Sequence, residues 1–152
     1  QNSKVLLLLI SILFGSMQFS SAQELDPVSW YAEIVSEKEN HTLVFTAQIE
    51  SGWYLYSQHI EEGGPIPTTF MLTLASNQLE AISAEEESEF QIKKLDEMFQ
   101  IELTKYKNKV KFIYPLDESV VAGTIYAQVE FMCCDEAQCL APRIEKFTLN
   151  LK

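Results

Sequence analysis

All three cysteines of the chain lie in the short stretch 133–139, at Cys133, Cys134 and Cys139. Thiols at such close spacing can form a disulfide and open it again by thiol–disulfide exchange. Cys134 and Cys139 flank the segment 135–138, which is typical of a hairpin turn, and cross-strand neighbours at the mouth of a hairpin lie about 4.5–5.5 Å apart, within reach of a disulfide. On the chain-entropy model a ring this small adds only about 2 kcal/mol of stability. The spacing therefore favours a disulfide that opens and closes over one that staples the fold.

The strand before the hairpin indicates which cysteine remains free. Side chains alternate across a strand, so Cys133 and Cys134 point to opposite faces. Cys133 shares a face that is wholly apolar and is predicted to be the core: Ile125, Ala127, Val129 and Phe131. Cys134 lies on the mixed, more accessible face with Met132 and Glu130. We therefore predict that Cys133 is a buried free thiol and that Cys134 pairs with Cys139.

Two other disulfide pairings and a metal site were weighed. A bulge at the turn would reverse the two faces and pair Cys133 with Cys139. A bridge between Cys133 and Cys134 would distort the peptide unit that joins them, which disfavours it. Three cysteines of which two are adjacent do not match a zinc spacing, and His41 and His59 could approach them only through the fold. We predict neither a metal nor another cofactor.

The first 22 residues have the pattern of a signal peptide. Lys4 precedes the apolar run Val5–Phe14, and small residues end at Ala22, where a signal peptidase would cut. The apolar run is too short to span a bilayer. We expect cleavage near Ala22, export of the protein and one mature domain at 23–152. The alternative is an uncleaved N-terminal anchor.

Charge and compartment limit the partners. An oxidising compartment permits disulfides. The full chain has a net charge of −11 at pH 7, and loss of Lys4 with the signal peptide makes the charge one unit more negative. So acidic a surface argues against nucleic acid or anionic lipid as a partner.

The mature part of the chain has the pattern of short strands separated by turns. Two stretches are exceptions: we expect the acidic run 85–89 to be an exposed loop, and 90–106 to be an irregular loop with strand ends, although 93–103 would also suit a short helix. About seven or eight strands predict an all-β sandwich. The predicted strands are 30–35, 41–49, 69–74, 79–82, 109–116, 124–132 and 144–151, with an aromatic segment at 52–60.

Two motifs resemble one family. The stretch 131–142 reads Phe-Met-Cys-Cys-Asp-Glu-Ala-Gln-Cys-Leu-Ala-Pro and resembles the cysteine motif of the N-terminal periplasmic domain of the thiol:disulfide interchange protein family, DsbD. The family has two prolines where this chain has Ala141-Pro142. The stretch 52–60, Gly-Trp-Tyr-Leu-Tyr-Ser-Gln-His-Ile, is similar to the family's Gly-Tyr-Tyr-Leu-Tyr-Arg-Gln-Gln-Ile, and 96–99 resembles its aromatic cap loop. The similarity extends over nearly the whole mature chain.

The resemblance implies an immunoglobulin-like β-sandwich and a role in electron transfer. The domain would take reducing equivalents from a membrane-embedded thiol conductor and pass them to periplasmic thioredoxin-like proteins, as a component of a protein-disulfide reductase. Cys139 would form the mixed disulfide and Cys134 would resolve it. Family members have four or five residues between the cysteines, so Cys133 remains the alternative to Cys134. The chain is either a stand-alone exported carrier or a piece of a longer protein.

The resemblance also assigns residues around the cysteines. Phe99, with Met98 beside it, would form a lid over the pair, and the cap loop also contains Asp96 and Glu97. Tyr54 and Tyr56 share a strand face and would lie next to the pair. The alternative for Phe99 and both tyrosines is an ordinary place in the core.

Asp135 and Glu136 lie between the paired cysteines. Anions beside a thiol disfavour the thiolate, so they would raise the thiol pKa and slow exchange. The alternative is that both are ordinary turn residues.

Two further hypotheses compete with an exchange domain. One is a non-catalytic immunoglobulin-like binding module with a structural disulfide. The other is a degenerate relative that has lost exchange and keeps only partner binding. The reduction potential separates exchange from a structural bridge, because structural bridges resist reduction.

Overall fold

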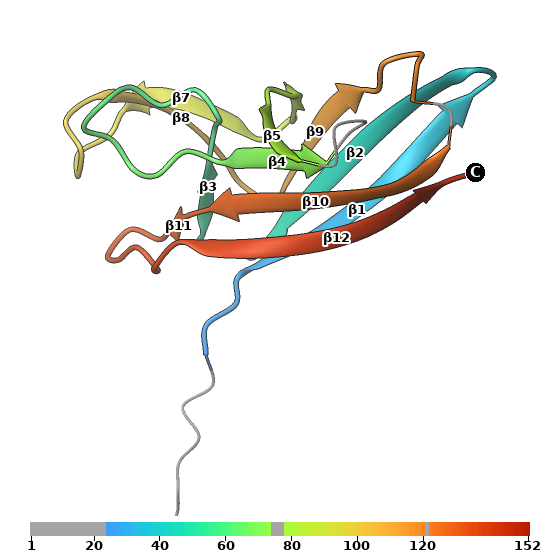
Figure 1. Cartoon of the computed structure of the whole chain (residues 1–152). Coiled ribbons are helices and arrows are strands. Elements are labelled where there is room, and N and C mark those ends of the chain that lie inside the picture. The colour runs from blue at the N-terminus through green and yellow to red at the C-terminus, as the bar shows by residue number, and fades with distance from the viewer. Residues whose placement is uncertain (1–23, 74–77, 121) are drawn as a thin grey trace, which may run out of the picture.

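The computed structural model describes residues 24–73, 78–120 and 122–152, and the expected signal peptide lies outside them. Every regular element in the described residues is a strand, so the all-β prediction is confirmed (Figure 1). None of the described residues forms a helix long and apolar enough to cross a membrane. The strands are β1 (Val28–Glu37), β2 (Asn40–Ile49), β3 (Tyr54–Tyr56), β4 (Thr69–Thr73), β5 (Leu79–Ile82), β6 (Glu85–Glu87), β7 (Gln91–Leu95), β8 (Glu102–Tyr106), β9 (Lys109–Pro115), β10 (Gly123–Phe131), β11 (Cys133–Cys134) and β12 (Arg143–Leu151).

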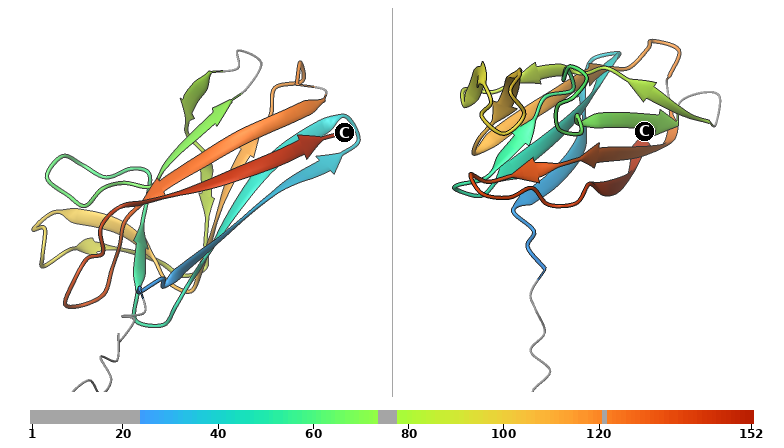
Figure 2. Two further views of the ribbon diagram at one scale, coloured as in Figure 1. Left: turned by 60° about the horizontal axis from the view of Figure 1, so that its bottom comes forward. Right: turned by 90° about the vertical axis from the view of Figure 1, so that its left-hand side faces the viewer.

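These strands form three antiparallel sheets of four strands each, ordered β1-β2-β9-β6, β12-β10-β4-β5 and β11-β3-β8-β7. The first two sheets pack face to face as an immunoglobulin-like sandwich. Phe70 of the second sheet lies between Phe45 and Phe112 of the first, with ring centroids 4.8 and 4.9 Å away. The third sheet lies at one end of the sandwich (Figures 1 and 2).

Alternation of side chains along β10 buries the apolar face that the sequence predicts to be the core. Along β10 the inward side chains are buried against β4 and the facing sheet, and Cys133 continues the same face beyond the strand: Ile125, Ala127, Val129, Phe131 and Cys133. Their outward neighbours, such as Tyr126 and Glu130, are exposed. The strand that leads into the hairpin is therefore fixed by burial of one apolar face.

The acidic run 85–89 is not the solvated loop that its composition predicts. Glu85–Glu87 forms β6 and pairs with β9 at the edge of the first sheet. Glu85 and Glu87 are exposed, whereas Glu86 turns inward and is partly buried. Composition misleads here because alternation turns one carboxylate of the run into the protein, where hydrogen-bond donors compensate its burial.

The segment 90–106 is a regular hairpin, neither an irregular loop nor a helix. β7 and β8 pair from Gln91↔Tyr106 to Leu95↔Glu102, and residues 96–101 form the loop between them. The apolar pattern is weak because β7 is an edge strand whose side chains are mostly exposed, and because a lysine, Lys105, takes an inward position on β8. These additional strands raise the strand number of the described residues above the seven or eight expected.

Three connections meet at the same end of the molecule. They are the loop 96–101, which we call the cap loop, the segment 57–68 after β3, and the hairpin turn 135–138, which project away from the C-terminal end of β12 (Figures 1 and 2). The third sheet brings them together, because β3 pairs with β8 on one side and with β11 on the other. The hairpin thus reaches the cap loop across this small sheet.

Candidate functional site

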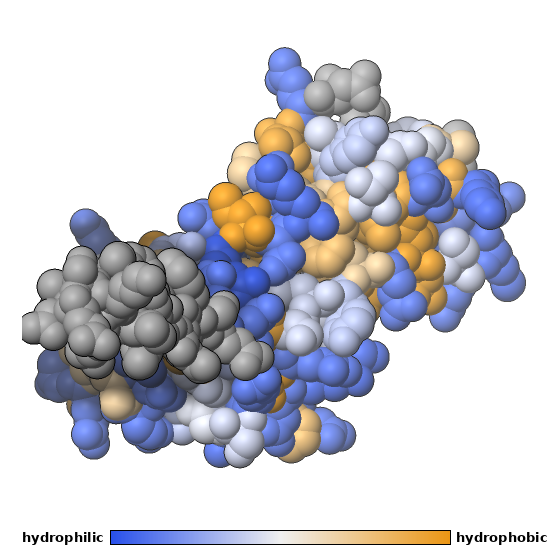
Figure 3. All heavy atoms as spheres, turned by 90° about the horizontal axis from the view of Figure 1, so that it is seen from below, coloured by the Kyte–Doolittle hydropathy of each residue, from blue (hydrophilic) through white to orange (hydrophobic). Residues whose placement is uncertain are grey.

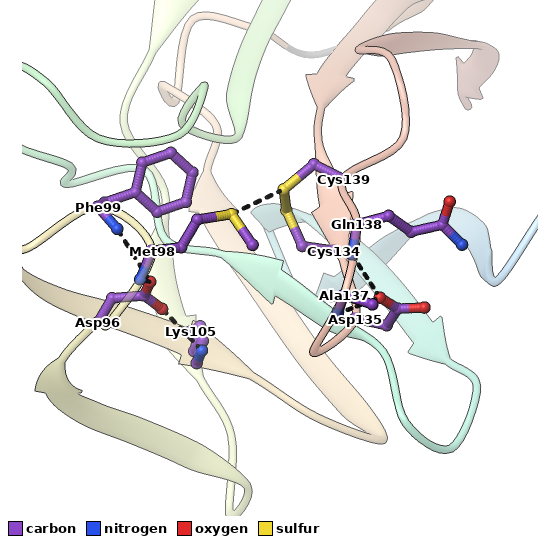
Figure 4. The surroundings of a disulfide bond; sticks show 9 residues. All are labelled: Asp96, Met98, Phe99, Lys105, Cys134, Asp135, Ala137, Gln138 and Cys139. Atoms are coloured by element: carbon purple, nitrogen blue, oxygen red, sulfur yellow. Dashed lines mark hydrogen bonds and ion pairs between the residues drawn. A yellow bond between two sulfur atoms is a disulfide. The ribbon is translucent and has the colours of Figure 1, made fainter.

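The cysteines form one disulfide and one free thiol. Cys134 and Cys139 are bonded, and Cys133 is free and buried, which is the pairing that strand alternation predicts. Cys134 and Cys139 face each other across an isolated antiparallel bridge, and Cys134 also pairs with Tyr54 of β3. Figure 4 shows the disulfide facing the cap loop.

The adjacent residues Cys133 and Cys134 are buried in two different apolar clusters. Cys133, 3% exposed, belongs to the main core of the sandwich. Cys134, only 1% exposed, belongs to a second apolar cluster with Tyr56 and Leu103. The face that Cys134 shares with Tyr126 and Glu130 is accessible at those two residues, as expected, but Cys134 itself is buried, because the third sheet and the cap loop cover it. Cys139 is the partly exposed sulfur of the pair.

The hairpin turn is held by Asp135. Its Oδ1 accepts hydrogen bonds from the backbone N–H groups of Ala137 and Gln138, each at 2.7 Å, and its own N–H donates to the carbonyl of Gln138 at 2.9 Å. The bonds from Ala137 and Gln138 lower the pKa of Asp135. Asp135 thus has the contacts of an ordinary turn residue, and it carries its negative charge next to Cys134.

Glu136 reaches from the turn to β3. The Tyr54 hydroxyl donates a hydrogen bond of 2.6 Å to its Oε1. This bond, together with burial and the charge of Glu136, raises the pKa of Tyr54. Tyr54 thereby connects the hairpin turn to the third sheet. Tyr56, which lies on the same strand face, is buried in the cluster that contains Cys134.

The cap loop covers the disulfide through two side chains. Sδ of Met98 lies 3.9 Å from Sγ of Cys139, and Met98 itself is 52% exposed (Figure 4). Phe99 packs against the cluster of Cys134, with its ring edge-on to Tyr56 at 6.3 Å between centroids. Both predicted lid residues therefore lie at the pair: Met98 contacts the exposed sulfur, and Phe99 covers the buried side.

Asp96 shapes the cap loop from inside. Its Oδ1 accepts the backbone N–H groups of Met98 at 3.0 Å and Phe99 at 3.3 Å, and its Oδ2 lies 2.9 Å from Nζ of Lys105. Burial raises the pKa of Asp96, but the ion pair with Lys105 and the two N–H groups outweigh it and hold that pKa below its usual value. Glu97, by contrast, is exposed, and its backbone carbonyl accepts a hydrogen bond from the Gln100 side chain.

Comparison with known families identifies this arrangement. Residues 22–151 match the family described as "Thiol:disulfide interchange protein DsbD, N-terminal". The chain belongs to this family. The resemblance of its cysteine and aromatic motifs to DsbD is thereby confirmed. None of the curated proteins with which the chain was compared matches it.

Solved structures of DsbD N-terminal domains share the fold. The Neisseria meningitidis DsbD N-terminal domain in its reduced form is 16% identical, with a TM-score of 0.53 over 80% of this chain and 84% of that chain. The N-terminal periplasmic domain of ScsB from Proteus mirabilis is also 16% identical, with a TM-score of 0.56 over 85% of this chain and 47% of that chain. A complex between the DsbD and PilB N-terminal domains of Neisseria meningitidis contains a chain 15% identical, with a TM-score of 0.50 over 78% of this chain and 80% of that chain. The immunoglobulin-like fold predicted for a DsbD N-terminal domain is confirmed.

Sequence reasoning missed two charged residues in this DsbD-family domain. Lys105 is buried between the cap loop and β3, with its Nζ 4.4 Å from the Tyr54 ring centroid. The signal was its alternation with Leu103 on one face of a strand, which places both side chains inward. A buried lysine needs a carboxylate partner, and Asp96 is the carboxylate that meets this need.

Glu86 is the second missed residue. Its carboxylate accepts hydrogen bonds from the Ser57 hydroxyl at 2.8 Å, from the Gln58 backbone N–H at 2.6 Å and from the Tyr106 hydroxyl. Burial, followed by Glu86, raises the pKa of Tyr106. Glu86 belongs to β6 of the sandwich and Tyr106 to β8, so this carboxylate joins the third sheet to the sandwich.

Proposed function

We propose that the domain exchanges thiols and disulfides through Cys134–Cys139 and relays reducing equivalents from a membrane-embedded thiol conductor to periplasmic thioredoxin-like proteins. Membership in the DsbD N-terminal family supports the exchange chemistry. The observation that carries the assignment of roles is the unequal access to the two sulfurs. Cys139 is partly exposed under Met98, whereas Cys134 is buried.

The unequal exposure of the two sulfurs determines which of them a partner thiolate attacks first. A thiolate from a reduced partner attacks Sγ of Cys139, the Cys134–Cys139 bond breaks, and Cys134 leaves as a thiolate that takes up a proton. The partner's second thiolate then attacks the partner's own sulfur in the mixed disulfide, and Cys139 leaves as a thiol. The domain becomes a dithiol and the partner a disulfide, so the transferred electrons and protons balance.

Onward transfer runs through the same atoms in reverse. The thiolate of Cys139 attacks the disulfide of an oxidised partner and forms the mixed disulfide. Cys134 then attacks Cys139, restores the domain disulfide and releases the partner as a dithiol. Cys139 is thus the residue that bonds to partners, and Cys134 is the resolving residue.

Met98 must leave Cys139 before either transfer. A sulfur attacking along the disulfide axis needs the space over Cys139 that Met98 borders. We assign Met98 and Phe99 as the side chains that shield the pair from adventitious thiols, and the negative charge of Asp135 and Glu136 as an influence that disfavours the thiolates. A carrier in an oxidising compartment benefits from both.

The proposed place of action is the periplasm, with residues 1–22 as a cleaved signal peptide and 23–152 as the mature domain. The likeness to the periplasmic domain of ScsB supports this compartment. N-terminal sequencing of the exported protein should give Gln23 as its first residue.

Single-cysteine variants test the roles. In a Cys133→Ala background, Cys134→Ala leaves Cys139 alone and Cys139→Ala leaves Cys134 alone. We expect oxidised glutathione to form a mixed disulfide with Cys139 at least about tenfold faster than with Cys134, because only Cys139 is accessible. The two variants should react alike in urea. Equal rates in the folded state would contradict the assignment, and no adduct with either would favour a structural bridge.

The partner class is tested with the same variant. The Cys134→Ala, Cys133→Ala protein should accumulate a mixed disulfide with a thioredoxin that lacks its own resolving cysteine, and the Cys139→Ala protein should not. Failure of the first adduct, with the glutathione adduct intact, would exclude thioredoxin-like partners while leaving exchange at Cys139 in place.

A further inference from the structure

A buried ammonium group lies between the two loops of the site. Lys105 is 9% exposed, and its partner Asp96 is 6% exposed. Nζ of Lys105 is 2.9 Å from Oδ2 of Asp96 and 4.4 Å from the Tyr54 ring centroid. A charge withdrawn from water is costly unless it is paired, so the position of Lys105 is set by the carboxylate on one side and the aromatic face on the other.

Each of these two contacts continues to a different loop. Asp96 holds the cap loop through the N–H groups of Met98 and Phe99. Tyr54 holds the hairpin turn through its bond to Glu136, which lies between the two cysteines. We call the four residues Asp96, Lys105, Tyr54 and Glu136 the cap tether. It runs without a gap from the loop that covers the disulfide to the turn that contains it.

The cap tether spans the contact that exchange must open. On one side of this contact is Met98, two residues from Asp96, and on the other is Cys139, which closes the turn that contains Glu136. Lys105 touches neither sulfur, so its effect on the disulfide must pass through the positions of the two loops. Its ammonium is the one group of the tether that joins the cap side to the hairpin side.

We propose that Lys105 is a positioning residue of the exchange site, which holds Met98 over Cys139 by tying the cap loop to the hairpin turn. This inference rests on the exchange function proposed above. It goes beyond the shielding by Met98 and Phe99, because it names the group that holds the cap loop closed. Removing the ammonium group should loosen the cap loop, although the two cysteines, Met98 and Phe99 are not themselves substituted.

The test is the rate at which dithiothreitol reduces the disulfide of the folded protein. Lys105→Met removes the charge and keeps a long apolar side chain. We expect reduction to be about tenfold faster, because a hydrogen bond between charged groups no longer holds the cap loop. Lys93→Met is the matched control. Lys93 lies on the neighbouring strand β7 in an exposed pair with Glu102, and its loss is expected to leave the rate unchanged.

Urea dependence separates cap opening from general loss of stability. Reduction through cap opening exposes little surface, so the rate of Lys105→Met should be nearly independent of low urea concentrations. Reduction through global unfolding would accelerate steeply with urea, and that result would overturn the positioning role. The double variant Asp96→Asn, Lys105→Met leaves no unpaired charge and should reduce as fast as Lys105→Met, which keeps the test available if the single variant folds poorly.

Two more variants test the two halves of the cap tether. Lys105→Arg keeps a cation and should stay within about threefold of the original rate. An increase equal to that of Lys105→Met would overturn the role of the charge. Tyr54→Phe keeps the aromatic face but loses the bond to Glu136 and should accelerate reduction, whereas Tyr31→Phe, at an exposed position of β1, should not. Equal rates for these two would remove the hairpin side from the proposal.

Failure of this inference is distinguishable from failure of the proposed function. If dithiothreitol opens the disulfide of the unaltered protein only when the protein unfolds, the exchange function itself is contradicted. If the unaltered protein is reduced in its folded state and Lys105→Met is reduced at the same rate, only the positioning role of Lys105 is wrong.

Discussion

At the scale of single residues, Cys133 and Cys134 show how one peptide bond separates two chemical environments. Cys133 points into the sandwich, and burial, the largest influence, raises its pKa to about 11. Cys134 points into the small cluster beneath the cap loop and is bonded to Cys139. Protonation and packing therefore both keep the free thiol of Cys133 unreactive.

This difference predicts selective labelling. In the reduced, folded protein at pH 8, iodoacetamide should modify Cys139 and leave Cys133 unmodified, because the thiolate is the reactive form and Cys133 is almost entirely protonated there. Mass spectrometry of the digested protein gives the extent at each position. In urea all three cysteines should be modified. Labelling of Cys133 in the folded protein at the rate of Cys139 would contradict the burial described here.

Alkaline pH should weaken the fold through the same thiol. The pKa of Cys133 is about 11 in the folded protein against 9.0 for an ordinary thiol. The unfolded chain therefore loses its proton first, and the stabilisation present below pH 9 is lost as pH rises toward 11. The decline of the free energy of unfolding over this interval, measured by urea titration, should be smaller in Cys133→Ala than in the unaltered protein. Equal declines would contradict the prediction. The comparison between the two proteins removes the contribution of Tyr56 and Tyr106, whose pKa values are also raised.

The residue pairing could be predicted from sequence, whereas the buried charges could not. Alternation along 125–133 reveals an apolar face directly, so the free cysteine follows from a local pattern. Alternation places Lys105 on the same strand face as Leu103, but this signal does not predict burial by itself, because a charged residue is normally solvated and the burial of Lys105 and Glu86 depends on partners that the fold brings to them. Asp96 and Tyr106 provide those partners only after the sheets have formed.

At the scale of elements, the third sheet depends on Glu86. Its carboxylate joins β6 of the sandwich to β8 and to the segment after β3, through Tyr106, Ser57 and Gln58. The short strand β3 carries both site tyrosines, so the position of the site depends on this junction.

Glu86→Ala should therefore destabilise the protein by about 1–3 kcal/mol, because the Ser57 and Tyr106 hydroxyls and the backbone and side-chain N–H groups of Gln58 lose their acceptor. Glu87→Ala, at the exposed neighbouring position, should change stability by no more than about 0.5 kcal/mol. Urea unfolding gives both values, and hydrogen exchange should show the loss concentrated in β3 and β8. Equal and small effects of both substitutions would show that the junction does not hold the sheet.

The strands with two-residue periodicity, such as β2, β9 and β10, are predictable because one face meets the core. The hairpin of β7 and β8 is less so, because β7 is an edge strand with little buried surface. The cap loop itself was assigned by resemblance to the family. Its closure by Asp96 and Lys105 required the structure.

At the scale of the whole molecule, the negative charge of the chain extends to the end that carries the disulfide. The net charge of the full chain is −11, and exposed or partly exposed carboxylates lie on all three connections at that end: Glu61, Glu62, Glu97, Asp135 and Glu136. Seen from below, the surface shows apolar side chains flanked by hydrophilic residues (Figure 3). The carboxylates near the disulfide create a field that acts on charged reagents.

Because of this field, we predict that small thiols of opposite charge reduce the disulfide at different rates. After correction for thiolate content, cationic cysteamine should reduce the disulfide faster than anionic mercaptoethanesulfonate. The ratio of the two rates should fall several-fold as salt shortens the screening length from about 30 Å at 0.01 M to about 3 Å at 1 M. A ratio that does not change with salt would contradict the electrostatic effect.

The reduction potential of the Cys134–Cys139 pair tests the central claim most directly. The chain without residues 1–22 is equilibrated with dithiothreitol or glutathione buffers, and free thiols are trapped and counted, with Cys133→Ala treated in parallel. We predict a potential within the range of exchange proteins, roughly −120 to −270 mV, and the same value for the variant. A disulfide that stays closed until the protein unfolds would contradict the exchange function and leave a structural bridge in a binding module.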